Sequence, residues 1–97
     1  MSGSDAVYFT SPTLTAAKIG RAVFCNTDSS AHALTMNLVA ASGSSAAANT
    51  LISALSLPPG YTYVSPELAG LVIPAGAMLR GVSDTTVTIE VSGVTIV

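Results

Sequence analysis

The two residue types best suited to covalent or metal chemistry occur once each in this chain, seven positions apart. Cys25 and His32 are the only cysteine and the only histidine, and Asp28 lies in the polar run between them. Cysteine catalysis needs a base that removes the thiol proton and a group that orients the base. If residues 23–40 form a hairpin, these three side chains could meet at its open end.

Other features of the sequence favour a structural role for this stretch. No glycine-rich cradle accompanies Cys25, and a buried cysteine behaves as a small apolar residue. Zinc takes four protein ligands, or three plus water, so a metal site would need three copies of His32 around a trimer axis. We therefore predict no catalytic, cofactor-binding or metal-ligating residue, and no enzymatic activity.

Two tyrosines and the dispersed carboxylates are the remaining candidates for a binding or catalytic site. Tyr61 and Tyr63 share one face of a predicted strand and could form a platform for a sugar. Alternatively, they could cover the corner after residues 58–60, with their rings buried and their hydroxyl groups exposed to solvent. No two acidic residues are spaced as an acid–base pair, and none forms a calcium loop; they are Asp5, Asp28, Glu67, Asp84 and Glu90.

The composition is unusually poor in charge for a small domain. Charged residues make up 8% of the 97 residues, apolar residues 49%, and the net charge is −2. Soluble domains carry about 25% charged residues, which keep their surfaces compatible with water. We infer that much of this surface contacts protein, as in a subunit of an assembly.

Several classes of protein are disfavoured by the same sequence. No run of about 18 apolar residues is long enough to span a membrane, and residues 1–9 lack the basic and apolar regions of a signal peptide. Three scattered basic residues give no footprint for nucleic acid. A single cysteine cannot form an internal disulfide, which fits folding in a reducing cytoplasm.

The pattern of strands and turns predicts one all-β domain over residues 1–97, with residues 1–5 flexible. Turn signals recur about every ten residues, as in an antiparallel sandwich. The predicted strands are 6–11, 18–26, 31–40, 50–57, 61–64, 77–82 and 85–97. Residues 41–50 are expected to form a surface loop, and 65–71 a single helical turn capped by Ser65.

Three glycines mark changes of direction in the predicted sheets. Pro-x-Gly follows an apolar strand at residues 58–60 and again at 74–76, which predicts two corners between sheets. Apolar residues switch parity after Gly93, so this glycine is expected at a bulge or a turn. A bulge would leave 85–97 as one bent strand. Two corners and a long bent strand favour a jelly-roll-like sandwich, with an immunoglobulin-like sandwich as the alternative.

Several phrases together resemble small virion proteins of tailed bacteriophages and prophages. They are the turn "NTDSSA", the "ANT" segment, the corner "IPAG" and the terminal "VSGV", within a likeness that covers approximately residues 7–97. The resemblance implies a β-sandwich subunit on the outside of the virion, often trimeric. It carries no active-site residues.

The resemblance and the composition lead to the same expected function. We expect a capsid decoration, or cement, protein that binds the major capsid lattice and stabilises it, on a virion assembled in the host cytoplasm. A neck, collar, tail or fibre subunit is the alternative in the same class. A carbohydrate-binding module for host attachment is the alternative in another class. The expected partners are further copies of the chain and other virion proteins, without nucleic acid or membrane.

Overall fold

Alternating apolar and polar residues build the chain almost entirely from short strands. The computed structural model describes residues 1–96. In this part of the chain the elements are β1 (Ala6–Thr10), β2 (Ala17–Lys18), β3 (Arg21–Asn26), β4 (His32–Val39), the 3₁₀ turn η1 (Ala47–Asn49), β5 (Thr50–Leu57), β6 (Thr62–Val64), β7 (Val72–Ile73), β8 (Met78–Val82), β9 (Val87–Ser92) and β10 (Thr95–Ile96). The predicted all-β fold is confirmed. No helix in this part of the chain is long and apolar enough to cross a membrane.

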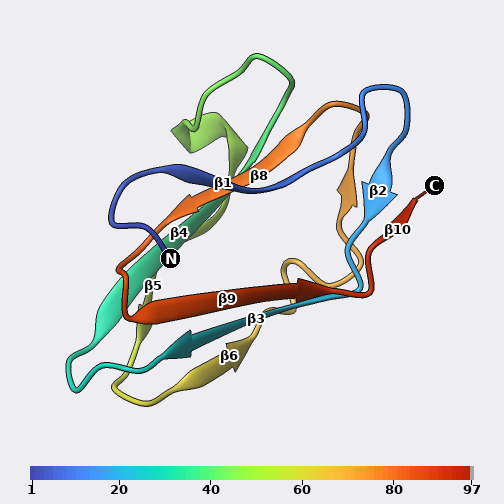
Figure 1. Ribbon diagram of the computed structural model, residues 1–97. Helices are drawn as coiled ribbons and strands as arrows, with labels where there is room; N and C mark the ends of the chain where they lie inside the picture. The colour runs from blue at the N-terminus through green and yellow to red at the C-terminus, as the bar shows by residue number, and fades with distance from the viewer. Residues whose placement is uncertain (97) are drawn as a thin grey trace.

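The strands pack as two layers joined by a corner. Strands β1, β8, β4 and β5 form the first layer in that order, and β6, β3 and β9 form the second, all antiparallel. A third sheet, β7, β2 and β10, continues the second layer in the same neighbour order. Figure 1 shows these three short strands rising at the C-terminal side of the molecule. The fold is therefore a sandwich that is closed at one end by a bend.

Two facing glycines make this bend possible. Gly93 has φ +67°, in the left-handed region, and separates β9 from β10. Gly20 separates β2 from β3, and a Cβ on it would lie 2.8 Å from the carbonyl oxygen of Gly93. Both strands change parity here, so their pairing continues on the far side of the bend, with Ile96 opposite Ala17. The prediction for Gly93 was a bulge or a turn, and the bulge is wrong: Ser92 pairs with Arg21 and Thr95 with Lys18, so neither strand has an extra residue. The chain bends here instead. The predicted single strands 18–26 and 85–97 are both interrupted, and Val97 lies outside the described residues.

The two Pro-x-Gly phrases are corners between sheets, as predicted. The turn at 58–60 carries the chain from β5 to β6, and the turn at 74–76 carries it from β7 to β8. Gly60 and Gly76 have φ of +70° and +74°. In each turn the residue after the glycine donates its N–H to the carbonyl of the first proline, at 3.1 Å and 3.0 Å. Glycine meets the requirement for positive φ in these turns without steric cost.

The turn between residues 26 and 32 is not a hairpin, which corrects the sequence interpretation. β3 pairs with β6 and β9, whereas β4 pairs with β5 and β8, so the chain crosses between the layers here. The turn at Asp84 is a crossing of the same kind, from β8 to β9. Each of these strands has a buried face, and a crossing lets both faces point into one core. The same turn-forming residues suit a hairpin and a crossing between layers, so the sequence did not distinguish the two kinds of connection.

The core lies between the two layers. Leu34 and Met36, at even positions of β4, face inward and are fully buried. Phe24 enters from the opposite layer and is also fully buried. Around them pack further buried side chains, namely Ile19, Ala22, Ile52, Leu57, Leu68, Ile73, Ala77, Leu79 and Val87. Apolar burial of this kind is the main favourable term in folding.

The outer face of β4 is covered at one end. Asn37 lies on this face, yet its side chain is only 5% exposed. The loop of residues 41–49 folds over it, and the Asn37 amide donates to the Ala46 carbonyl at 3.0 Å and to Asn49 Oδ1 at 2.8 Å. The predicted surface loop is therefore present and is fixed to the sheet by an asparagine.

The order of connections departs from that of an immunoglobulin-like sandwich. Only β4 and β5 form a hairpin within one sheet; the other connections between long strands cross from layer to layer (Figure 1). In immunoglobulin-like sandwiches the first two strands are neighbours in one sheet. Here β1 and β3 lie in different layers, so the strand order departs from that alternative.

Candidate functional site

Three ionisable side chains meet where two of the layer crossings come together. His32 begins β4, and its Nε2 lies 2.7 Å from Oδ2 of Asp28 in the preceding turn. Its Nδ1 lies 3.8 Å from Oδ2 of Asp84, in the turn between β8 and β9. A neutral imidazole carries a single N–H and can donate to only one of two flanking carboxylates, whereas an imidazolium donates from both nitrogens.

Hydrogen bonds lower the pKa of both carboxyl groups in this cluster. The bond with His32 is the main cause that lowers the pKa of Asp28, and the backbone N–H of Ser29 lowers it further. The pKa of Asp84 is lowered chiefly by the backbone N–H and then by the hydroxyl of Thr86, which both donate to its Oδ1. Each acid thus caps its own turn, and His32 joins the two turns.

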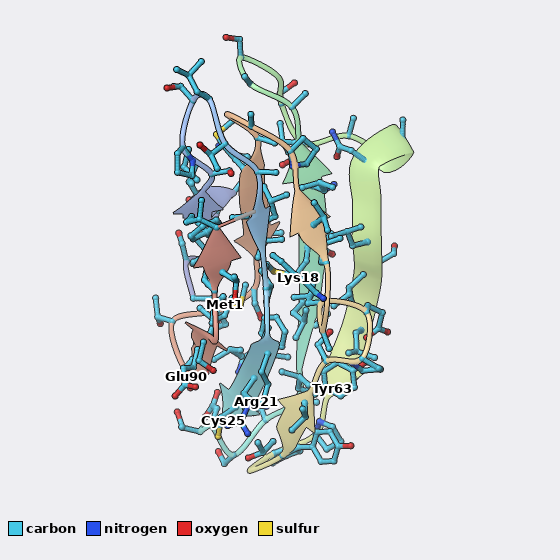
Figure 2. The ribbon with its side chains drawn as sticks, turned by 90° about the vertical axis from the view of Figure 1, so that its right-hand side faces the viewer. Met1, Lys18, Arg21, Cys25, Tyr63 and Glu90 are labelled. Atoms are coloured by element: carbon cyan, nitrogen blue, oxygen red, sulfur yellow. The ribbon has the colours of Figure 1, made fainter. Side chains whose placement is uncertain are left out.

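Cys25 does not belong to this cluster. It lies on the outward face of β3, half-buried, and its sulfur accepts a hydrogen bond from the Thr62 hydroxyl at 3.6 Å. In Figure 2, Glu90, Cys25 and Tyr63 mark β9, β3 and β6 from left to right. The hairpin in which Cys25 and His32 could have met is not formed, because their strands are in different layers. Asp28 and His32 are brought together, and the thiol has no adjacent base.

The residue that organises this turn is Asn26, which sequence reasoning missed. Its side chain is fully buried, and its amide Nδ2 donates to the carbonyls of Ser30 at 2.9 Å, Leu57 at 2.9 Å and Pro58 at 3.3 Å. Its Oδ1 accepts from the N–H of Asp28 at 3.0 Å. One side chain therefore fastens the end of β3 to the end of β5 in the other layer. The alternation of residues along β3 could have revealed this burial from the sequence, because Asn26 lies on the same inward face as Ala22 and Phe24.

The two tyrosines do not form a shared platform. Tyr63 packs on the core with its ring 6.5 Å from that of Phe24, while Tyr61 is 47% exposed in the turn before β6. The Tyr63 hydroxyl donates to Glu67 Oε1 at 2.5 Å, and this bond raises the pKa of Tyr63 to about 12. The same bond is the main cause that lowers the pKa of Glu67. The alternative expectation, that the rings cover the corner after residues 58–60, describes Tyr63. The difference is that its hydroxyl was expected in solvent and is instead hydrogen-bonded to Glu67.

The predicted cap of the following turn is present. The Ser65 hydroxyl accepts the N–H of Leu68 at 3.2 Å and donates to Glu67 Oε1 at 3.1 Å. Residues 66–70 form turns here and no helix. This short network holds Glu67 in place for Tyr63, and it lies on the side of the second layer away from the His32 cluster.

Neither a cavity nor a group of metal ligands is found among residues 1–96. No pocket opens in this part of the chain, and no three His, Cys, Asp or Glu side chains are grouped to hold a metal ion. The two carboxylates beside His32 contact different ring nitrogens, so the three groups do not converge on one point.

Comparisons with known proteins give no relative. No family model matches the chain, and neither a curated protein nor a solved structure is similar to it.

Proposed function

We propose that this protein is a structural subunit of a tailed-bacteriophage virion, a decoration protein that binds the outside of the major capsid lattice and stabilises it. Its copies associate around a symmetry axis, as trimers if they follow the proteins that the sequence resembles. It performs no chemistry. Because it binds only the assembled shell, binding raises the free energy needed to take the shell apart.

Exposed apolar side chains are the observation that carries this proposal. Leu14, in the loop between β1 and β2, is 94% exposed, and Ile96 and Val64 are each 55% exposed. Four more large apolar side chains are exposed, namely Val7, Tyr61, Val72 and Val94. Single exposed apolar residues are normal on a monomer. Seven of them, in a chain with eight charged residues, fit a surface that contacts protein.

The few charges present are largely occupied within the molecule. Arg80 Nε donates to Asp5 Oδ2 at 2.9 Å, and Asp28 and Asp84 flank His32. On the outward face of the second layer six of eight side chains are uncharged, namely Val23, Cys25, Thr62, Val64, Thr88 and Ser92, and the other two are Arg21 and Glu90. Interfaces between proteins are depleted of charged residues at their centres, and this composition fits that pattern.

Binding to phage shells tests the proposed function. Purified protein is added to expanded capsid shells that lack it, and bound copies are counted after sedimentation. We expect saturable binding at a fixed number of copies per capsid protein, together with a higher temperature of shell disruption. Binding of only a few copies, at one vertex or on tails, would point to a neck or tail subunit instead, and absence of binding to any virion part would contradict the proposal.

The cysteine and the histidine supply matched controls for this experiment. Cys25→Ser and His32→Ala leave the exposed apolar side chains in place, so both variants should bind shells as the parent does. Met36→Lys places a charge at a fully buried position and should prevent folding. Loss of binding by a folded Cys25→Ser variant would show that the thiol has a role that this proposal denies.

A further inference from the structure

One edge of the sandwich is built differently from the others. Strand β9 has six residues and pairs in unbroken register with β3, while no strand covers its other side. The long edge strands of the first layer are both interrupted: β1 at Tyr8, and β5 at Ser53 and Ala54, where Ala54 has φ +49°. Bulges of this kind protect an edge against pairing with another chain. β6, β7 and β10 have three residues or fewer.

The main-chain groups on this edge point outward at every second residue. The carbonyl of Thr86 accepts from Thr27 at the end of β3, so it faces inward to the sheet. The next carbonyl, of Val87, accepts from the Met1 amino group and therefore faces away from β3. Because direction alternates along a strand, the N–H and C=O groups of Ile89 and Val91 also face away. Neither residue has a hydrogen-bond partner on this side among residues 1–96.

The side chains along the edge separate cleanly by face. Thr88 and Glu90 are exposed on the outer face. The inner face carries a row of apolar side chains whose exposure to solvent increases along the chain. Val87 is fully buried, Ile89 and Val91 are half-buried, and beyond the bend Val94 is 38% and Ile96 is 55% exposed. An incoming strand would therefore find unpaired main-chain groups beside an incompletely covered apolar row.

We propose that the β9 edge pairs with the β9 edge of a second copy of this chain, antiparallel about a two-fold axis at Ile89. The two second layers then join as one six-stranded sheet. Ile89 faces its own symmetry mate, and Val87 faces Val91 of the other copy, which supplies about six main-chain hydrogen bonds. The apolar rows of the two copies meet on the inner face and cover each other.

Charge and the number of paired strand residues favour this register, in which the edge is complementary to a second copy of itself. With the axis at Ile89, each Glu90 stands opposite Thr88 of the other copy, and no like charges face each other. Moving the axis to Glu90 would place Glu90 opposite Glu90, which is unfavourable. Moving it to Thr88 would place Val91 opposite Thr85, which lies in the turn before β9, so this register has fewer strand residues to pair. The edge is thus complementary to itself in one alignment, a property that an isologous contact requires.

The N-terminal segment competes for one end of the edge. The Met1 amino group occupies the Val87 carbonyl that Val91 of the other copy would use. Figure 1 places the N-terminus beside the first half of β9. Two further hydrogen bonds hold the segment, from the Ser83 N–H to the Ser2 carbonyl at 3.0 Å and from the Ser2 N–H to the Tyr8 hydroxyl at 2.9 Å, and the Met1 side chain packs against the core. Pairing of two copies would displace the Met1 amino group.

Disulfide cross-linking between two exposed positions tests the contact and its register. Thr88→Cys and Glu90→Cys are made separately in a Cys25→Ser background, which removes the neighbouring thiol. In the proposed pair the two new cysteines lie opposite each other, with Cα atoms about 4.5 Å apart, a separation that a disulfide spans. Oxidation of the mixed full-length proteins should give a covalent dimer, and oxidation of either protein alone should give only background.

Two results would overturn the proposal. One is the absence of a mixed dimer above the yield of a control pair in which Glu90→Cys is replaced by Ser29→Cys, an exposed position away from this edge. The other is a dimer formed by Glu90→Cys alone, because it would report the register with the axis at Glu90. A gel assay identifies this contact whether it forms dimers in solution or joins trimers to each other.

A proline variant tests the same edge without cysteines. Val91→Pro removes an N–H that faces away from β3 and leaves the ladder with β3 intact, which edge strands tolerate. If two copies pair, the native mass of the parent protein should rise at high concentration. We expect Val91→Pro to abolish this increase and Val91→Ala, which keeps the N–H, to retain it. Equal behaviour of the two folded variants would contradict strand pairing. The proposal does not rest on the virion function, since shell binding and edge pairing are measured separately.

Discussion

Replacement of Asn26 by aspartate should destabilise the fold far more than a change of one atom suggests. In the native protein the side chain of Asn26, at the end of β3, is fully buried. Its amide nitrogen donates to three main-chain carbonyl oxygens. A carboxylate in the same place turns a donor into a charged acceptor that faces those three oxygens. Its negative charge is then buried beside groups that repel it.

The expected magnitude follows from the groups left without partners. A buried carbonyl that loses its hydrogen bond costs about 1–3 kcal/mol, and the Leu57 carbonyl is the deepest of the three that Asn26 satisfies. Asn26→Ala should therefore lower the free energy of unfolding by about 2–4 kcal/mol. Asn26→Asp should exceed this loss at pH 7, because an unpaired buried charge costs more than an unpaired polar group.

The pH dependence distinguishes this mechanism from general damage to the core. Burial and the three carbonyls raise the pKa of an aspartate here above its unfolded value of about 3.9. A group with a raised folded pKa favours folding below the unfolded value, and this contribution is lost as the pH rises through the folded value. The deficit of Asn26→Asp relative to the native protein should therefore be smallest near pH 3 and should grow toward neutral pH.

Urea denaturation followed by circular dichroism at several pH values measures this deficit. Asn49→Asp is the matched control, because the Asn49 amide donates to one exposed carbonyl, that of Ser44. It should cost less than about 1 kcal/mol at any pH. The reasoning would be refuted if Asn26→Asp were as stable as the control at pH 7, or if its deficit did not change between pH 3 and pH 7.

Three further predictions concern backbone conformation and a hydrogen-bonded tyrosine. Gly20→Ala should destabilise the protein by about 2–3 kcal/mol more than Gly60→Ala in urea denaturation, since the first Cβ would meet backbone at 2.8 Å and the second, at φ +70°, meets nothing within 4 Å. Ala54→Gly should raise the melting temperature, because φ +49° costs alanine about 1–2 kcal/mol, more than the added freedom of glycine in the unfolded chain costs. Absorbance titration should show one tyrosine ionising near pH 12, and Tyr63→Phe should remove it. Because this pKa is raised on folding, the bond to Glu67 favours the fold below about pH 10, and that contribution is lost as the pH rises toward 12.

Much of the strand content was determined by local sequence. Strand β5 begins and ends at the predicted residues, and both Pro-x-Gly phrases turn the chain between sheets. The parity change at Gly93 also located the bend correctly. These features depend on alternation with a period of two and on the dihedral angles that glycine and proline permit, and both are properties of a few consecutive residues.

Only the tertiary structure decided which strands became neighbours. Whether β3 and β4 pair or cross depends on the faces that β6, β8 and β9 offer, and those strands are distant in sequence. The roles of Asn26 and Gly20 followed from this choice, because each meets a partner from another part of the chain. The sequence by itself determined where the chain extends and turns, while long-range packing decided what each turn joins and therefore why Cys25 and His32 lie apart.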